Sequence, residues 1–128
     1  MSIQFKTIER PQPGVSGGGT RKFYATPVLG REVTLEALTR AIERKSTLSG
    51  ADIRAVLYAM VEQAADGLAE GRVIRLGDLG SLRISLSSDG RDTPEEVTSS
   101  AIRRTGVIFT PGKKMQDMLK NARFQKVN

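Results

Sequence analysis

The sequence of 128 residues contains no cysteine and no histidine. These two absences exclude disulfide bonds, thiolate nucleophiles, imidazole bases and every metal site built from Cys or His. The sequence also lacks an apolar run near the roughly 18 residues of a membrane span, and its first residues lack the apolar core of a secretory signal. No group of carboxylates has the spacing of a calcium-binding loop. We therefore expect a cytoplasmic protein that holds no metal or cofactor and contacts no membrane.

Carboxylates and lysines remain as candidates for catalysis. Asp and Glu gather at residues 89–96, a segment in which a Gly and a Pro predict an exposed turn. Carboxylates surrounded by water are poor general acids, because nothing in such a setting tunes them for proton transfer. An enzyme is therefore the weakest hypothesis, and we expect no small-molecule substrate.

Positive charge is concentrated toward the two ends of the chain. The formal net charge is +6, from 20 basic and 14 acidic residues. By segment the net charge is +3 over residues 1–33, −2 over 34–71, +1 over 72–109 and +4 over 110–128. A basic footprint of this kind attracts polyanions such as nucleic acid. A solvated surface tuned for solubility has the same composition, and charge alone leaves both interpretations open.

Residues 71–86 form the segment around which the rest of the chain is organised. The pattern predicts two short strands, the second of which alternates apolar and polar residues over 82–86. Gly77 and Gly80 bracket the link between the strands. Glycine reaches positive φ at no steric cost, so this spacing suits a sharp reversal of the chain. We expect this hairpin to be the middle of a single sheet.

Two helices are predicted before the hairpin. Thr34 is placed to cap a helix that ends near Lys45, and Ser49 is placed to cap a second helix that ends before Gly71. The second helix has a broad apolar face over residues 53–68. That face is larger than one small helix and a three-stranded sheet can cover, which favours a partner chain.

The sequence after the hairpin predicts a helical turn at residues 94–100, a strand at 102–110 and a short basic helix at 113–121. Leu79 and Phe109 are expected in the core.

The N-terminal region has weaker signals. Residues 1–8 resemble an edge strand, residues 9–20 read as a loop or linker, and a short apolar segment at 23–28 could pair with the first strand. A disordered basic arm is the alternative. Phe124 and Val127 are expected to dock the C-terminal tail.

This order of elements resembles the HU/IHF family of histone-like bacterial DNA-binding proteins. The run Gly71-x4-Leu76-Gly77-x-Leu79-Gly80-Ser81-Leu82 looks like the family's glycine-rich hairpin, and Thr110-Pro111-Gly112-Lys113-Lys114-Met115 looks like the stretch leading into its last helix. The resemblance covers roughly residues 33–123, and the extension before it resembles that of HU-like proteins from Bacteroidetes-type bacteria. It divides the chain into an extension at 1–32 and an HU-like domain at 33–128, with an arm excursion at 86–106.

The resemblance implies an α+β, IHF-like fold with two N-terminal helices, a three-stranded antiparallel sheet with an arm, and a short C-terminal helix. Two chains would intertwine as a homodimer, and their sheets would form a saddle on double-stranded DNA. The expected function is to bind duplex DNA with low sequence specificity and to bend or condense it in the nucleoid. The implied DNA-binding residues are Arg75, Arg83, Arg91, Arg103, Arg104, Lys113, Lys114 and Lys120.

The arm departs from the family pattern. The family's Arg-Asn-Pro-x-Thr-Gly tip is missing, and Asp89, Asp92, Glu95 and Glu96 stand around Pro94 instead. Pro94 is either a wedge between base steps, as the resemblance implies, or the first residue of a helical turn. Carboxylates repel phosphates. The alternative function is therefore a dimeric structural or protein-interaction module that keeps the HU fold and has lost strong DNA binding at its acidic arm.

Overall fold

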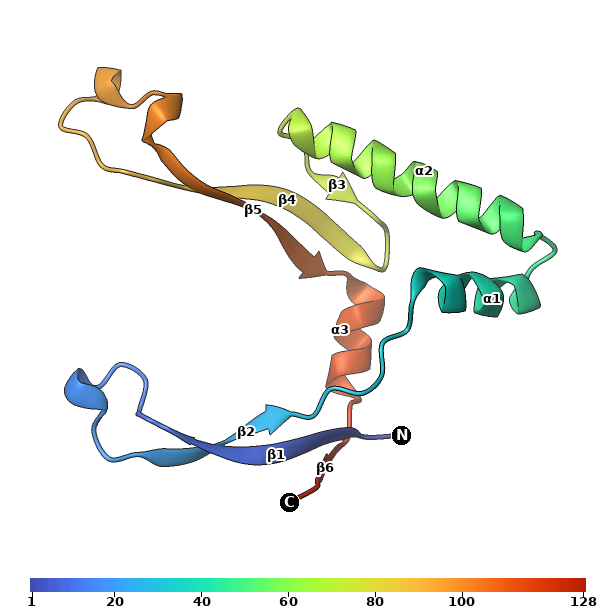
Figure 1. Ribbon diagram of the computed structural model, residues 1–128, viewed down its shortest axis with the longest axis horizontal. Helices are drawn as coiled ribbons and strands as arrows, with labels where there is room; N and C mark the ends of the chain where they lie inside the picture. Colours follow the sequence, from blue (N-terminus) through green and yellow to red (C-terminus); the bar gives the residue numbers. More distant parts are fainter. The chain divides into compact units, whose positions relative to one another are not determined.

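The computed structural model describes residues 1–128 and divides them into two compact units. The helix–arm unit comprises Thr34–Asp117, and the terminal unit comprises Met1–Val33 together with Met118–Asn128. The chain is α+β, with three α-helices and two three-stranded sheets (Figure 1). The elements are β1 Ile3–Arg10, β2 Lys22–Pro27, α1 Leu35–Lys45, α2 Gly50–Ala69, β3 Ile74–Arg75, β4 Gly80–Ser88, β5 Ile102–Pro111, α3 Lys113–Lys120 and β6 Phe124–Lys126, with 3₁₀ turns η1 Ser16–Gly18, η2 Pro94–Glu96 and η3 Ser99–Ala101.

Both predicted N-caps are confirmed. The hydroxyl of Thr34 accepts a hydrogen bond from the N–H of Ala37 at 3.2 Å, where α1 begins. The hydroxyl of Ser49 accepts from the N–H of Asp52 at 3.2 Å, where α2 begins. Each bond satisfies a donor that the first turn of a helix leaves without a partner.

The end of α2 is also as predicted. Gly71 has a φ of 78°, its N–H donates to the carbonyl of Leu68, and the N–H of Arg72 donates to the carbonyl of Gly67. This is the Schellman arrangement, in which glycine at positive φ lets two last-turn carbonyls find donors.

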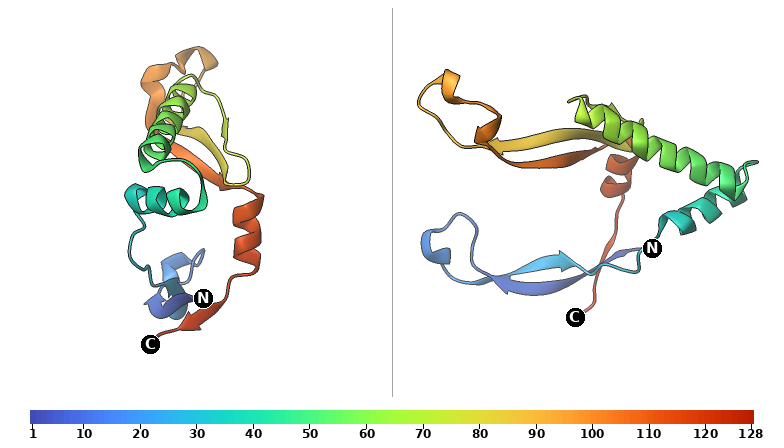
Figure 2. Two further views of the ribbon diagram at one scale, coloured as in Figure 1. Left: turned by 90° about the vertical axis from the view of Figure 1, so that its right-hand side faces the viewer. Right: turned by 45° about the horizontal axis from the view of Figure 1, so that its top comes forward.

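The sheet of the helix–arm unit has the order β3-β4-β5 and is antiparallel throughout. Figure 2 shows β4 and β5 continuing away from the sheet as a two-stranded arm that ends in the 3₁₀ turns η2 and η3. Gly80 begins β4 at a φ of 149°, and a methyl group there would collide with the carbonyl oxygen of Thr110 on β5. Only glycine allows the two backbones to approach this closely.

The terminal unit forms a second sheet, of order β2-β1-β6. The predicted three-stranded antiparallel sheet is thus present as β3-β4-β5, and the structure adds this second sheet to it. The N-terminal hairpin is present as β1 and β2, and the tail joins it because Phe124–Lys126 pairs in parallel with β1. Val127 adds a bond from its N–H to the carbonyl of Phe5 at 3.0 Å. A strand of three residues is too short to show any hydrophobic period, so the sequence carried no signal for it.

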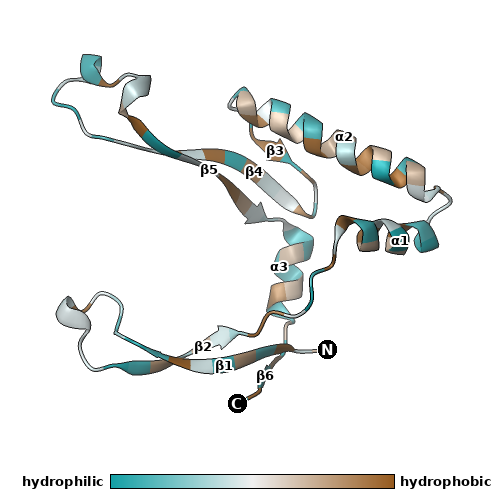
Figure 3. Ribbon diagram, viewed as in Figure 1, coloured by the Kyte–Doolittle hydropathy of each residue, from teal (hydrophilic) through white to brown (hydrophobic).

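Little of the chain is buried within a single copy. Ile53 and Ala101 are its only buried apolar residues, and the core positions expected for Leu79 and Phe109 are wrong, because these are 45% and 47% exposed. The accessible surface is 10,539 Å², whereas a compact chain of 13.9 kDa exposes about 6,700 Å². Two separate globules of the sizes of these units would still expose only about 8,000 Å². Apolar residues recur along the whole length of α2 (Figure 3).

Candidate nucleic-acid interface

One face of the β3-β4-β5 sheet carries three of the predicted arginines. Residues paired across a ladder share a face, and alternate residues along a strand do so too. Ser81 pairs with Arg75, and Arg83 lies two residues further along β4. Four residues beyond Arg83, Ser87 pairs with Arg104 on β5. Arg75, Arg83 and Arg104 therefore share one face, which we call the arginine face.

The opposite face of this sheet is apolar. Leu82 pairs with Phe109 and Ile84 pairs with Val107, so these four side chains point away from the arginines. The sheet therefore separates an apolar surface from a cationic one, as alternation along β4 predicts.

The arginine face is open to an incoming anion. Most of its other side chains are short, being serines on β4 and Thr110 and Gly106 on β5, and Ile108, which pairs with Arg83, is its one large apolar side chain. Arg75, Arg83 and Arg104 form none of the ion pairs in the structure. Their guanidinium groups keep the full set of donors that can fork onto phosphate oxygens.

Arg91 and Arg103 are in a different situation. Both bind the carboxylate of Asp89 at the base of the arm, Arg91 at 3.6 Å and Arg103 more closely. The ladder shifts register between Ser87 and Ser88, which takes Arg103 out of the regular alternation. The structure therefore brings these two predicted residues together, but it compensates their charge with a carboxylate.

The tip of the arm packs on itself. The N–H of Asp89 donates to the carbonyl of Ala101 at 2.8 Å, and Ala101 is fully buried. Pro94 occupies the first turn of η2, so the structure shows it as a helix-start residue. Glu95 and Glu96 follow it and are exposed. The arm thus presents an acidic cap at the place where the family resemblance implied a DNA-inserting tip.

The three predicted lysines lie on α3. Lys113 forms an ion pair with Asp117 at 3.3 Å, one turn along the helix. The N–H of Lys114 donates to the carbonyl of Asp78, which ties the start of α3 to the β3–β4 turn. Lys120 falls in the terminal unit. It is the only one of the eight predicted DNA-binding residues that lies in the terminal unit.

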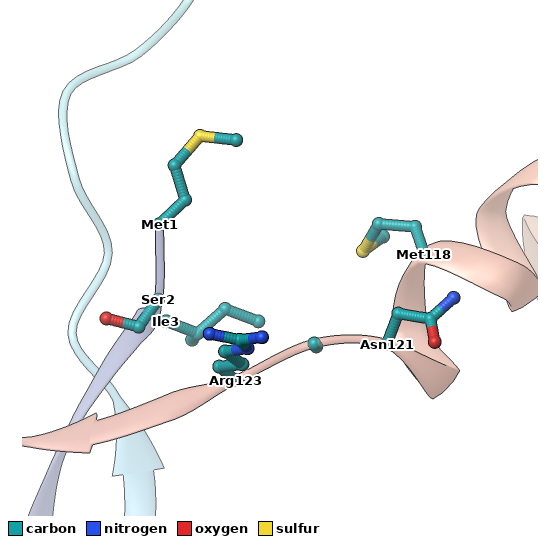
Figure 4. Close-up of a pocket in the computed structure, with 7 residues that line it drawn as sticks. Met1, Ser2, Ile3, Met118, Asn121 and Arg123 are labelled. Carbon is teal, nitrogen blue, oxygen red and sulfur yellow. The ribbon is translucent and has the colours of Figure 1, made fainter.

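The depression drawn in Figure 4 has no acid–base pair. An open depression in the terminal unit is lined by Met1, Ser2, Ile3, Met118, Asn121, Ala122 and Arg123 (Figure 4). Arg123 is its single charged side chain, and it contains no carboxylate that could act as a base. No group of three or more Asp or Glu residues is arranged to hold a metal ion. None of the helices combines the length and the apolarity needed to cross a bilayer.

Comparison with known proteins gives one family and a solved fold. The model of HU domains fused to a winged helix-turn-helix, an immunoglobulin-like domain or a glycine-rich motif matches residues 1–126. The crystal structure of a candidate bacterial DNA-binding protein from Bacteroides vulgatus ATCC 8482 has the same fold, with a TM-score of 0.70 at 13% identity. The match covers 98% of this chain and 48% of that one, so this chain spans about half of its length. None of the curated proteins is similar enough to count as a relative.

Proposed function

Because this chain belongs to the family of HU domains fused to a winged helix-turn-helix, an immunoglobulin-like domain or a glycine-rich motif, we propose that it binds double-stranded DNA through its arginine face. It does so as a homodimer, with low sequence specificity, and it bends or condenses the duplex. The nucleoid is the location that this activity implies.

The observation that carries the proposal is the line of unpaired arginines. Arg75, Arg83 and Arg104 are staggered along three neighbouring strands and extend over six residues of β4. At the strand rise and spacing of a sheet, this line is about 20 Å long. A duplex advances about 3.4 Å per base pair, so the line spans the phosphates of about six base pairs. Contacts to phosphate position a duplex without reading its bases, which accounts for low specificity.

Dimerisation is supported by α2. Val56, Met60 and Val61 are 61%, 41% and 57% exposed, although Ile53 on the same helix is buried. A helix that is apolar on more than one side needs cover on more than one side. The surface that the chain exposes beyond two compact globules of these sizes, about 2,500 Å² per chain, is large enough for an obligate interface. A second copy that covers α2 would also place two arginine faces on one assembly.

Bending follows from having two cationic faces rather than from a wedge. A duplex that curves to reach both faces gains phosphate contacts, and these offset a bending cost of about 1–6 kcal/mol. The acidic cap around Pro94 plays no part in this mechanism, because its carboxylates repel phosphates.

The test is a gel shift with linear, nicked and four-way-junction DNA at two salt concentrations, beside a mass measurement in solution. We expect a dimer that prefers distorted DNA. The double variant R83Q/R104Q should reduce the slope of log affinity against log salt by about two for each chain that contacts the duplex. The control R40Q/R44Q removes the same charge from α1 and should leave the slope unchanged. Equal slopes for the two variants would show that the arginine face has no special role.

A second candidate function rests on the acidic cap. The helix–arm unit contains 12 basic and 12 acidic residues and is therefore neutral. A dimeric protein-interaction module with this fold would use the exposed carboxylates of the arm to bind a basic partner. That function predicts a dimer that shifts none of the three DNA substrates at either salt concentration.

A further inference from the structure

The terminal unit carries the whole net charge of the chain. It contains eight basic and two acidic residues, a net charge of +6, whereas the helix–arm unit is neutral. Net charges counted along the sequence do not show this division, because residues 118–128 fold with the first 33 residues. Long-range attraction to a polyanion therefore originates in the terminal unit.

The charges of the terminal sheet gather on one of its faces. Ladder pairing places Lys6 opposite Thr26, Ile8 opposite Tyr24, and Arg10 opposite Lys22. Because alternate residues share a face, Lys6, Arg10, Lys22 and Tyr24 all point the same way, and we call this side of the sheet the basic face. The basic face includes no Asp or Glu.

The other side of the same sheet is apolar. Ile3 pairs with Phe124 and Phe5 pairs with Pro27, and these residues line an apolar depression together with Ala25 and Leu119. The one acidic residue on β1, Glu9, also belongs to that side, and it is bound by Arg21 at 3.2 Å. The carboxylate of Glu9 is therefore not available to compensate the basic face.

The basic face is costly for the fold unless an anion binds it. Arg10 and Lys22 are directly opposite each other on antiparallel strands, where like charges destabilise the pair. Neither they nor Lys6 forms an ion pair in the structure. The guanidinium of Arg10 lies 5.4 Å from the ring centroid of Tyr24, which holds it in place over the sheet. Repelling charges held in fixed positions are typical of a surface that binds a polyanion.

We propose that the basic face is a second binding surface for the phosphate backbone of duplex DNA. Lys6 and Arg10 are four residues apart on β1, which separates them by about 13 Å along the strand, or the rise of about four phosphates on one DNA strand. An extended row of cations along a strand suits a polymer with regularly spaced charge better than a small anion. This surface is independent of the arginine face, and it does not require the saddle to bind.

The test compares two double variants of the full chain. R10Q/K22Q removes the facing pair, whereas R31Q/K126Q removes the same charge from the terminal unit but off the basic face. Arg31 precedes α1 outside the sheet, and Lys126 pairs with Phe5 on the apolar side. Affinity for a short linear duplex would be measured by fluorescence anisotropy over a range of salt concentrations.

For one chain in contact with the duplex, R10Q/K22Q should reduce the salt slope by about 1.8, which corresponds to about 60-fold weaker binding at about 0.1 M salt. R31Q/K126Q should keep the parent slope. Equal losses of salt slope in the two variants would show that only net charge matters and would overturn the proposal. So would binding of the parent to vesicles of anionic lipid with no binding to duplex, since this outcome would assign the basic face to a membrane surface.

Two further variants keep the result interpretable. K6Q/K22Q leaves the contact between Arg10 and Tyr24 in place, so its slope should fall as for R10Q/K22Q even if the latter distorts the sheet. R83Q/R104Q tests the arginine face separately. A loss of slope in R83Q/R104Q without one in R10Q/K22Q and K6Q/K22Q would refute the basic face alone, and the reverse pattern would refute only the arginine face.

Discussion

Replacing Val56 with alanine should weaken self-association of the chain without unfolding it. Val56 is on α2 and is 61% exposed in a single copy, although Ile53, three residues before it on the helix, is buried. If a second copy covers this side of α2, the valine side chain becomes buried only on association. Truncation then removes buried apolar surface from the dimer and almost none from the monomer.

The size of the effect follows from that exposure. The side chain of valine has two carbon atoms more than that of alanine. Burying each such CH₂ or CH₃ group contributes about 0.8 kcal/mol. Scaled by the exposed fraction of 61%, the loss is about 1 kcal/mol per chain. A twofold interface contains the residue twice, so the dimer loses about 2 kcal/mol, or about 30-fold in its dissociation constant.

Sedimentation equilibrium over a series of protein concentrations measures this constant directly, and far-UV circular dichroism checks that the helices are kept. Val15→Ala is the matched control, because Val15 is 45% exposed but lies in the loop between β1 and β2. It should associate like the parent. An unchanged dissociation constant for Val56→Ala, or a parent chain that is monomeric at every concentration, would refute the reasoning.

Three more predictions concern single positions. Gly80→Ala should lower the free energy of unfolding, measured by urea denaturation, by about 2 kcal/mol or more, because the positive φ of Gly80 is strained for alanine and the new methyl group collides with β5. The control Gly90→Ala should keep the parent's free energy of unfolding, because its methyl group would meet nothing within 4 Å. Asp89→Asn should release the two arginines bound to it and steepen the salt slope of duplex binding by about one to two. The control Asp66→Asn makes the same change in charge and should keep the parent slope. Equal changes in the two variants would contradict a specific role for Asp89. Ser49→Ala should cost about 1 kcal/mol of unfolding free energy through loss of the α2 cap, and an unchanged urea midpoint would show that the cap contributes nothing.

The helices could be predicted from the sequence because their limits depend on local chemistry. Thr34, Ser49 and Gly71 each act through hydrogen bonds to residues no more than four positions away. The hairpin at residues 71–86 and the strand after the arm were predictable for a similar reason, since a period of two and turn glycines are visible within a short window. The arginine face follows from the same alternation once the partner strand is known.

What could not be predicted depends on contacts between distant residues. Pairing of β6 with β1 joins the two ends of the chain, and three residues contain no pattern that identifies the partner. The ion pairs of Arg91 and Arg103 with Asp89 follow a register shift at the end of β4, and no residue type in the sequence predicts that shift. The basic face was missed for both reasons, because counting charge along the sequence separates residues that the fold brings together.

The salt slope can also report how the two proposed surfaces are used in a dimer. A symmetric dimer presents each face twice, so a double variant removes four cations from the assembly rather than two. If one duplex contacts both copies of a face, the slope should fall by about four, whereas contact with a single copy gives about two. A bent duplex on the saddle requires the arginine faces of both chains, so R83Q/R104Q should give the larger value. R10Q/K22Q has no such requirement, because each basic face can hold a duplex by itself. A value near two for both variants would mean that the chain binds DNA without bending it across the dimer.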